Sequence, residues 1–323
     1  MIFETLPTAP RAEELIDKAF SRAARAGRAK PTLEAQQSML TIAVNITSDN
    51  LENVVTAWPD FDYIDPFYYE LADAIVDVDE LRQSLSEVMW ASRQIEEIGR
   101  EYGPKLRKAD PDVARKHRKQ AFARIADIMD EIEDDLRAVG DARDALKNLP
   151  DIRPDEPAIV IAGYPNVGKS SFVNHVTNAR NEIAEYPFTT KGVQIGHVER
   201  DHIRYQLIDT PGLLDRPEAE RNDIERQAAG ALEHLADTVL FFVDASGDCG
   251  YPLAVQLELR DAVVERFADR DIPVLTICNK SDRSTDVEAD AYMSVTEQDG
   301  IDEVLELAID AVGFEPELPS RDA

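Results

Sequence analysis

The sequence has few of the residues that build metal centres and disulfide frameworks. Of its 323 residues only two are cysteine and five are histidine. Cys249 and Cys278 lie apart without CxxC spacing, and the histidines are scattered along the chain. These absences argue against structural zinc and favour a reducing compartment, so we expect a cytoplasmic protein.

Long apolar runs are missing as well. No apolar stretch reaches the roughly 18 residues of a membrane-spanning helix, so we expect no membrane partner. The first twenty residues lack a basic region followed by an apolar block, and we expect no signal peptide. Because 43% of the residues are hydrophobic, the chain still predicts a large folded core.

Positive charge is scarce. The chain carries 64 acidic against 35 basic residues, a net charge of −29, and only ten of the basic residues are lysine. A uniform acidic excess with little lysine resembles proteins of salt-accumulating halophiles. We interpret it as a solvated acidic surface and expect no DNA binding, because such a field repels nucleic acid unless salt screens it.

Residues 1–150 are expected to form an all-α helical bundle domain, because apolar positions recur there at spacings of three and four. Asp65-Pro66 is typical of a helix start. Longer helices are expected from about Asp79 to Gly103 and from Asp110 to Leu149, with Trp90 in the core.

After residue 150 the hydrophobic period changes. A proline-rich linker is expected at residues 151–157, because proline cannot continue a helix. From residue 158 to 323, apolar runs such as AIVIAG, TVLFFVDA and PVLTICNK alternate with helical stretches, and GVQIGHVER and IRYQLID alternate like a hairpin. This pattern predicts a three-layer α/β domain with a mostly parallel sheet.

The stretch GYPNVGKSSF fits the pattern GxxxxGK[ST] and lies between an expected strand and an expected helix. Backbone N–H groups of such a loop wrap a polyphosphate. Lys169 would place its charge on the β- and γ-phosphates, and the Ser170 hydroxyl would bind Mg²⁺. The predicted nucleotide-binding residues of this loop are Gly163, Tyr164, Pro165, Asn166, Val167, Gly168, Lys169, Ser170 and Ser171.

Two further motifs end apolar strands in the order that a P-loop GTPase domain requires. In DTPG, the Asp209 carboxylate can reach the Mg²⁺ shell indirectly and the Gly212 N–H can reach the γ-phosphate. In NKSD, Asp282 can accept two hydrogen bonds from guanine, whereas adenine offers no such donor pair. Asn279 and Lys280 would brace that loop and cover the base.

Other nucleotide contacts are less sharply marked. Ser294 and Val295 form a degenerate match to a loop that supports the base. The segment EYPFTTKG must supply a threonine to Mg²⁺, and the residues alone leave Thr189 and Thr190 open. Leu213 occupies the position of the glutamine that orients the attacking water in Ras-type switches, and its side chain cannot hydrogen-bond.

The segments GYPNVGKSS, YPFTT and DTPGLLDRP together resemble the Obg-related GTPases. With ELIDKAFSRAARAGRA and SLSEVMWASRQIEEIGREY, the chain resembles the Nog branch, in its archaeal and halophilic form, over nearly its whole length. The resemblance implies a GTP-hydrolysing switch in large ribosomal subunit assembly, with GTP or GDP and Mg²⁺ bound. Eukaryotic members carry a long C-terminal extension, whose functions are not carried over.

By the same resemblance Thr190 is the Mg²⁺ ligand, and Asn166 helps to seat a K⁺ ion near the bridging phosphates. The catalytic residues so implied are Lys169, Thr190, Gly212 and Asn166. Leu213 leaves two interpretations open. Either it only packs its loop in an enzyme that is slow until a partner activates it, or a bound cation neutralises charge while the backbone or a ribosomal partner aligns the attacking water.

The segment from Arg100 to Arg124 reverses the acidic trend, with nine basic residues against three acidic ones. A smaller basic stretch runs from Arg22 to Lys30. A solvated face is one interpretation; against an acidic background we favour a surface for the RNA of the large-subunit precursor. We expect the free protein to be monomeric.

Two other functions are open. One is an RNA- or ribosome-binding platform that nucleotide stabilises without appreciable turnover, which single-turnover hydrolysis with and without ribosomal particles would distinguish. The other is a tRNA-modifying GTPase, which the lack of a cysteine pair and of a separate modification domain disfavours.

Overall fold

A computed structural model describes residues 2–28, 30–147, 149, 152–177, 182–184, 193–209, 214–215 and 223–314. By its internal contacts the chain divides into two compact units. The helical unit comprises Ile2–Tyr63 and Val76–Lys147, and the sheet unit comprises Ile64–Ile75 and Asn148–Ala323 together with Met1.

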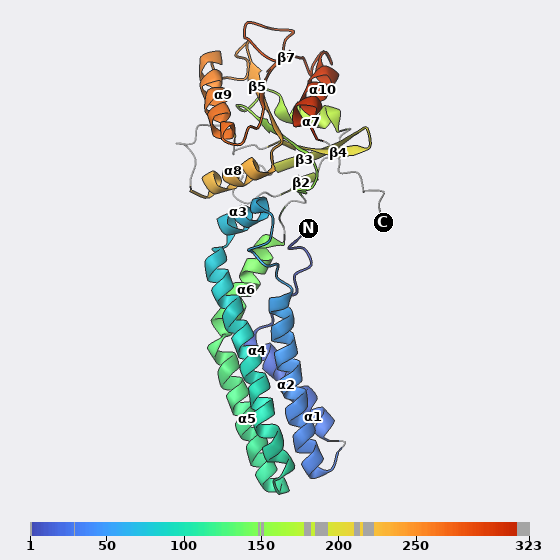
Figure 1. The fold of residues 1–323 in the computed structure, drawn as a ribbon, viewed down its shortest axis with the longest axis vertical. Helices are drawn as coiled ribbons and strands as arrows, with labels where there is room; N and C mark the ends of the chain where they lie inside the picture. Colours follow the sequence, from blue (N-terminus) through green and yellow to red (C-terminus); the bar gives the residue numbers. More distant parts are fainter. Residues whose placement is uncertain are drawn as a thin grey trace, which may run out of the picture. The chain divides into compact units, whose positions relative to one another are not determined.

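Five helices build the helical unit (Figure 1). A buried core that includes Leu40, Ile95 and Ile125 joins them, and the stacked rings of Phe20 and Phe122 add to it. No helix in the described part of the chain combines the length and apolarity of a membrane span. The helices are α1 (Ala12–Gly27), α2 (Thr32–Thr56), α4 (Val78–Arg107), α5 (Pro111–Glu131) and α6 (Glu133–Leu146).

Two expectations for this unit were wrong. The single helix expected from Asp110 to Leu149 is two helices, separated at Ile132, where φ is −99° and ψ is 11°. The first turn of α6 holds three carboxylates, which stabilise a helix N-terminus. Trp90 is not in the core, because it is 38% exposed on α4.

Helix α3 (Pro66–Ile75) lies in the chain between α2 and α4 but belongs to the sheet unit. It begins as expected, with the Asp65 carboxylate accepting from the Phe67 N–H at 2.9 Å. It packs against α8 (Asp223–Leu235), and Glu70 Oε1 lies 2.7 Å from His234 Nε2. The domain boundary expected near residue 150 would instead put α3 in the helical domain.

The sheet unit holds a seven-stranded sheet in the order β2-β3-β4-β1-β5-β6-β7. Strands β4, β1, β5, β6 and β7 are parallel, and β3 and β4 form the expected hairpin with β2 added at the edge. The strands are β1 (Ala158–Ala162), β2 (Glu182–Ala184), β3 (Val193–Arg200), β4 (Ile203–Asp209), β5 (Thr238–Asp244), β6 (Val274–Asn279) and β7 (Ala291–Tyr292).

Helices cover both faces of the sheet, which confirms the three-layer α/β prediction (Figure 1). On one face, α7 (Lys169–Val176) packs with α10 (Ile301–Val312). On the other face lie α8 and α9 (Leu253–Ala268), and Glu233 of α8 forms an ion pair with Arg266 of α9. Strands buried on both faces explain the continuous apolar runs in the sequence.

The placement of α3 gives a stability prediction. Leu71 on α3 is fully buried, so Leu71→Ala should cost about 2–5 kcal/mol of the unfolding free energy of the sheet unit. Hydrogen exchange should accelerate in β1 and β5 but not in α4 and α5. The matched variant Leu40→Ala, in the core of the helical unit, should give the reverse pattern; identical patterns for both variants would contradict the division.

Candidate nucleotide-binding site

The candidate site lies at the carboxyl edge of the parallel strands. Strands β1, β4, β5 and β6 end at Ala162, Asp209, Asp244 and Asn279, and they are neighbours in the sheet. In open α/β sheets this edge is where ligands bind, because the connections that follow the strands form a crevice there.

The loop from Gly163 to Gly168 joins β1 to α7 in a shape that depends on its glycines. Gly163 has φ 126°, and a Cβ there would lie 2.5 Å from the Phe242 carbonyl oxygen. Gly168 has φ 104°, and a Cβ there would lie 2.0 Å from Asn279 Nδ2. Asn166 also has a positive φ, 65°, which asparagine tolerates better than most residues. The loop is thus a cradle that side chains at these glycines would fill.

Lys169 is folded against its own loop. The residue is only 6% exposed, and its Nζ donates to the carbonyls of Gly163 at 2.6 Å and Tyr164 at 2.9 Å. The ammonium group therefore lies over the cradle at the start of α7. The Gly163 N–H in turn donates to the Leu214 carbonyl at 3.2 Å, which links this loop to the chain after β4.

The expected Mg²⁺ residues of the described chain come together. The Ser170 hydroxyl, in the first turn of α7, donates to Asp209 Oδ2 at the end of β4. Asp209 is 1% exposed and Ser170 is exposed beside the cradle. A hydroxyl next to a carboxylate is a set of hard oxygen donors that suits Mg²⁺.

Asn279 connects three loops. Its Nδ2 donates to the Val167 carbonyl at 2.8 Å, and its Oδ1 accepts from the Val295 N–H at 3.3 Å. The Ser294 hydroxyl donates to Asp282 Oδ1 at 2.6 Å. The structure therefore brings together the NKSD segment, the 294–295 loop and the cradle.

Two family models match this chain. The NOG1 N-terminal helical domain matches residues 3–153, and the family described as 50S ribosome-binding GTPase matches residues 158–280. The chain belongs to the Nog1 family of GTP-binding proteins. This confirms the resemblance to the Nog branch and the fold, a helical domain followed by a P-loop GTPase domain.

Named relatives agree with this Nog1 membership. An uncharacterized protein of Methanocaldococcus jannaschii, MJ1408, is 38% identical over 87% of this chain and 81% of its own length. Nucleolar GTP-binding protein 1 of Arabidopsis thaliana is 34% identical over 87% of this chain and 43% of that protein. The chain spans less than half of such nucleolar relatives.

A solved Plasmodium falciparum structure described as nucleolar GTP-binding protein 1 is 29% identical, with a TM-score of 0.46. That alignment covers 51% of this chain and 90% of the other.

Several expected site residues lie outside the described residues. They are Thr189 and Thr190 in the segment 185–192, and Gly212 and Leu213 in the segment 210–213. Their roles remain predictions. Of the other residues expected in the phosphate loop, Pro165 lies within the cradle and is partly exposed, and Ser171 lies in the first turn of α7 and is exposed.

Asp244, the last residue of β5, was not among the expected site residues. It is 0% exposed and accepts from Lys280 Nζ at 2.6 Å. Burial by itself raises the pKa of this carboxyl, but the hydrogen bonds from Lys280 and Ser246 outweigh it and hold the pKa below its usual value. A carboxylate at the carboxyl end of a buried parallel strand was the available signal.

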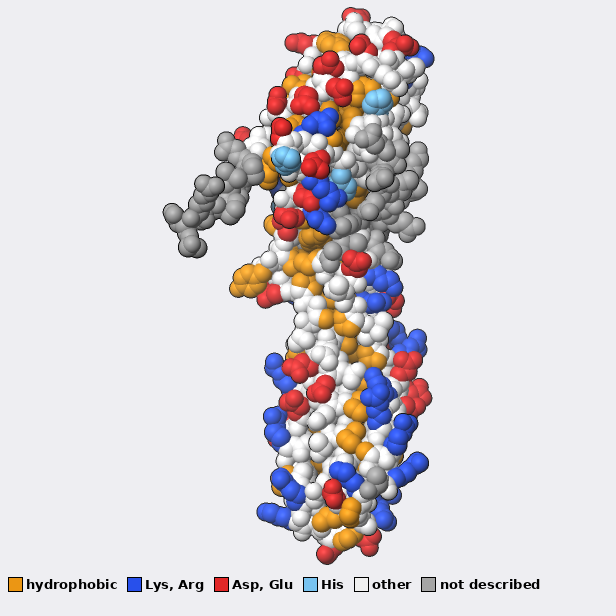
Figure 2. Space-filling view, turned by 90° about the vertical axis from the view of Figure 1, so that its right-hand side faces the viewer, with side chains coloured by type: hydrophobic (Ala, Val, Ile, Leu, Met, Phe, Trp, Pro, Cys, Tyr) orange, Lys and Arg blue, Asp and Glu red, His pale blue; other side chains and the backbone are white. Residues whose placement is uncertain are grey.

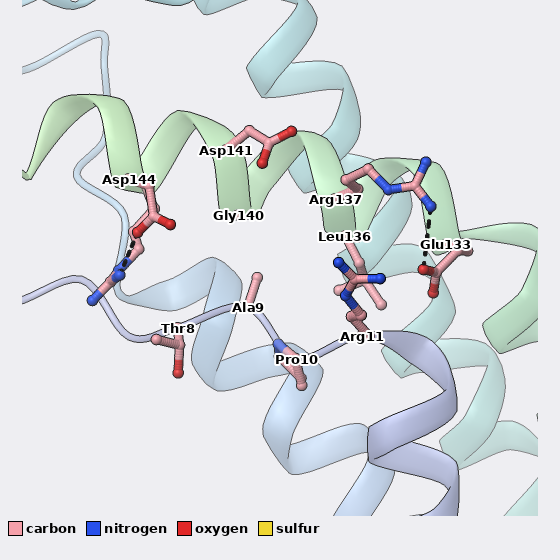
Figure 3. Close-up of a pocket in the computed structure, with 11 residues that line it drawn as sticks. Thr8, Ala9, Pro10, Arg11, Glu133, Leu136, Arg137, Gly140, Asp141 and Asp144 are labelled. Atoms are coloured by element: carbon pink, nitrogen blue, oxygen red, sulfur yellow. Dashed lines mark hydrogen bonds and ion pairs between the residues drawn. The ribbon is translucent and has the colours of Figure 1, made fainter.

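The helical unit contains a cavity of its own, which is lined by ion-paired side chains (Figure 3). It has a volume of about 200 Å³ between the segment Thr8–Arg11 and one side of α6. Ion pairs of Arg137 with Glu133 and of Arg143 with Asp144 occupy its wall. The described residues hold no cluster of histidine, cysteine and carboxylate side chains that could bind a metal by itself.

Proposed function

We propose that this chain binds guanine nucleotide and hydrolyses GTP as a switch in the assembly of the large ribosomal subunit. The observation that carries the proposal is the meeting of the cradle, the Ser170–Asp209 pair and the Asn279–Asp282 segment at one sheet edge. Membership of the Nog1 family and the match to a ribosome-binding GTPase model support it.

Each part of the proposed site has a role set by its chemistry. The cradle would offer backbone N–H groups to the phosphates, and Lys169 would turn its ammonium from the loop carbonyls toward them. Ser170 would bind Mg²⁺ and Asp209 would hold it indirectly. Bound Mg²⁺ neutralises negative charge on the β- and γ-phosphates.

Thr190 and Gly212 are proposed to close on the γ-phosphate in the GTP state and to release it after hydrolysis, which would make their segments the switch. Leu213 cannot orient the attacking water, so we propose that a bound cation and a ribosomal partner supply that function. Asn166 is exposed on the cradle, where its side-chain oxygen can reach a K⁺ ion.

The test of guanine binding is the exchange Asp282→Asn. The amide N–H of the new asparagine would face the exocyclic amine of guanine, which is itself a hydrogen-bond donor. Xanthine carries a carbonyl in place of that amine and can accept from the amide. We expect GTP affinity to fall about 10- to 100-fold and XTP affinity to rise, as measured by calorimetry. As a control, Lys169→Ala should lower the affinity for both GTP and XTP. An Asp282→Asn variant that still prefers GTP would refute the assignment of Asp282 to the base.

The K⁺ proposal predicts cation-dependent turnover. Replacing K⁺ by Na⁺ at constant ionic strength should slow single-turnover GTP hydrolysis, because the smaller ion fits a K⁺ site poorly. Asn166→Ala should abolish the difference between the two salts. Equal rates of the wild-type protein in K⁺ and Na⁺ would contradict a K⁺ site at Asn166.

The proposed RNA surface lies at one end of the helical unit. Here α1 and α4 end and α2 and α5 begin, so the basic stretches 22–30 and 100–124 meet. Arg118 Nε donates to Gln36 Oε1 at 2.7 Å, which ties the start of α5 to that of α2. Lys and Arg side chains gather over the lower half of the helical unit in Figure 2.

The basic side chains at this end of the helical unit fall into two groups, those already held by neighbouring side chains and those able to contact phosphate. Arg100, Lys105 and Arg124 form ion pairs with neighbouring glutamates, and Arg118 is held by Gln36 and the Phe122 ring. Other exposed cations form no ion pair with a described residue, and we propose that these contact RNA phosphates. They are Arg22, Arg25, Arg28, Arg107, Lys108, Lys116 and Lys119.

Charge reversal tests this surface. Glutamate at Arg107, Lys108, Lys116 and Lys119 should weaken binding to large-subunit RNA or particles and flatten its salt dependence, because fewer counterions are released. GTP affinity should not change. Arginine at the three lysines should preserve binding, and Arg93→Glu, elsewhere on α4, should have little effect. Unchanged particle binding with the same salt slope would place the RNA contact elsewhere.

A further inference from the structure

The loop of residues 245–251, which we call the brace loop, follows β5 beside the proposed nucleotide site. Asp244 anchors its first half. Its Oδ1 accepts from the Ser246 N–H at 3.0 Å, and its Oδ2 accepts from the Cys249 N–H at 2.8 Å. A buried carboxylate that is satisfied by the loop's own N–H groups fixes the path of that loop.

Gln256 on α9 holds the second half of the brace loop. The residue is 0% exposed. Its Nε2 donates to the carbonyls of Tyr251 at 2.8 Å and Asp244 at 3.0 Å, while its Oε1 accepts from the Asp244 N–H at 2.8 Å. One buried amide thus fastens both ends of the loop to the same helix.

Two contacts join the brace loop and its anchor Asp244 to the chain at and just after the NKSD segment. Lys280 Nζ lies 2.6 Å from Asp244 Oδ2. Arg283, three residues further along, forms an ion pair with Asp248 in the middle of the loop. The proposed base-binding segment and the brace loop therefore share buried and exposed charge pairs.

At its far end the brace loop reaches the cradle. The Tyr251 ring packs on the Tyr164 ring, with centroids 4.3 Å apart and planes inclined by 30°. Tyr164 is 6% exposed, and its carbonyl is one of the two that accept from Lys169. The Tyr251 hydroxyl makes no hydrogen bond to a described residue, so its ring is the part that contacts the cradle.

We propose that the brace loop couples the base-binding segment to the phosphate-binding cradle and that Tyr251 is its positioning residue for nucleotide binding. The proposal rests on the proposed function of the site. Tyr251 need not touch nucleotide: its ring restrains Tyr164, and through the Tyr164 backbone it restrains the carbonyl that orients Lys169. The order of contacts is Lys280, Asp244, Gln256, Tyr251 and Tyr164.

A structural role alone predicts a different outcome from a positioning role. If Tyr251 only filled space, its loss would lower the melting temperature and leave the affinity of the folded protein unchanged. If it positions the cradle, the folded variant should bind phosphates less well. Preference for guanine should persist in either case, because Asp282 and Ser294 are untouched by the change.

The experiment compares Tyr251→Leu, which removes the ring but keeps an apolar side chain, with Tyr251→Phe, which keeps the ring. In the folded full chain, Tyr251→Leu should bind GTP and GDP about three- to tenfold more weakly in calorimetry, the size expected for an aromatic pair. Tyr251→Phe should bind like the wild type. Tyr63→Ala, at an 87% exposed tyrosine of the helical unit, is the control for loss of a tyrosine.

Two results would overturn the proposal. One is a folded Tyr251→Leu variant with affinity within twofold of the wild type, and the other is a Tyr251→Phe variant as weak as Tyr251→Leu. If Tyr251→Leu does not fold, Tyr164→Leu removes the other ring of the same stack: weaker GTP binding by the folded variant supports the proposal, and affinity within twofold of the wild type overturns it. Failure of the wild type to bind GTP would instead refute the proposed function.

Discussion

Gly168 and Asn279 leave room between them only for a hydrogen atom, and the candidate site depends on that approach. The glycine ends the cradle after β1, while the asparagine ends β6, which is separated from β1 by β5. A Cβ on Gly168 would lie 2.0 Å from Asn279 Nδ2, the atom that donates to the Val167 carbonyl. Without glycine at this point, the asparagine could not join the two loops, and the distance between a phosphate cradle and a base-binding carboxylate would not be fixed.

The position of a helix in the sequence does not decide which of the two units it packs in. Helix α3 is encoded inside the helical segment, yet its fully buried Leu71 and its Glu70–His234 contact belong to the sheet unit. A continuous segment that starts after residue 147 would therefore lack one of the helices that pack on α8. From Ile2 onward the chain passes between the two units after Tyr63, after Ile75 and after Lys147, so α3 is covalently joined to the helical unit at both of its ends.

The sequence predicted those parts of the molecule that local chemistry dictates. Glycines at 163 and 168 specify the cradle because its backbone has positive φ and close contacts there, and Lys169 and Ser170 follow at fixed positions with the side chains that phosphate and Mg²⁺ require. Apolar runs likewise specify strands that are covered on both faces. The Ile132 break and the placement of α3 could not be read in this way, because an amphipathic pattern shows that a helix is buried but not against which partner.

The missed site residues have the same explanation. Asp244 is visible as a strand-end carboxylate, but nothing in the order of residues says that Lys280 is its partner. Tyr251 and Tyr164 are 87 positions apart, and only the fold brings their rings together.

The acidic charge of the chain affects its two proposed binding surfaces differently. With a net charge of −29, long-range electrostatics oppose every anionic ligand at low salt. A phosphate cradle depends little on that field, because backbone N–H groups and Lys169 act within hydrogen-bonding distance. RNA binding depends strongly on that field, because exposed cations such as Arg107 and Lys116 act on the phosphates through solvent. Exposed cations that form no ion pair within the described part of the chain gather at one end of the helical unit, which is what the proposed anionic partner needs in an otherwise acidic protein. The nucleotide site depends instead on its local geometry.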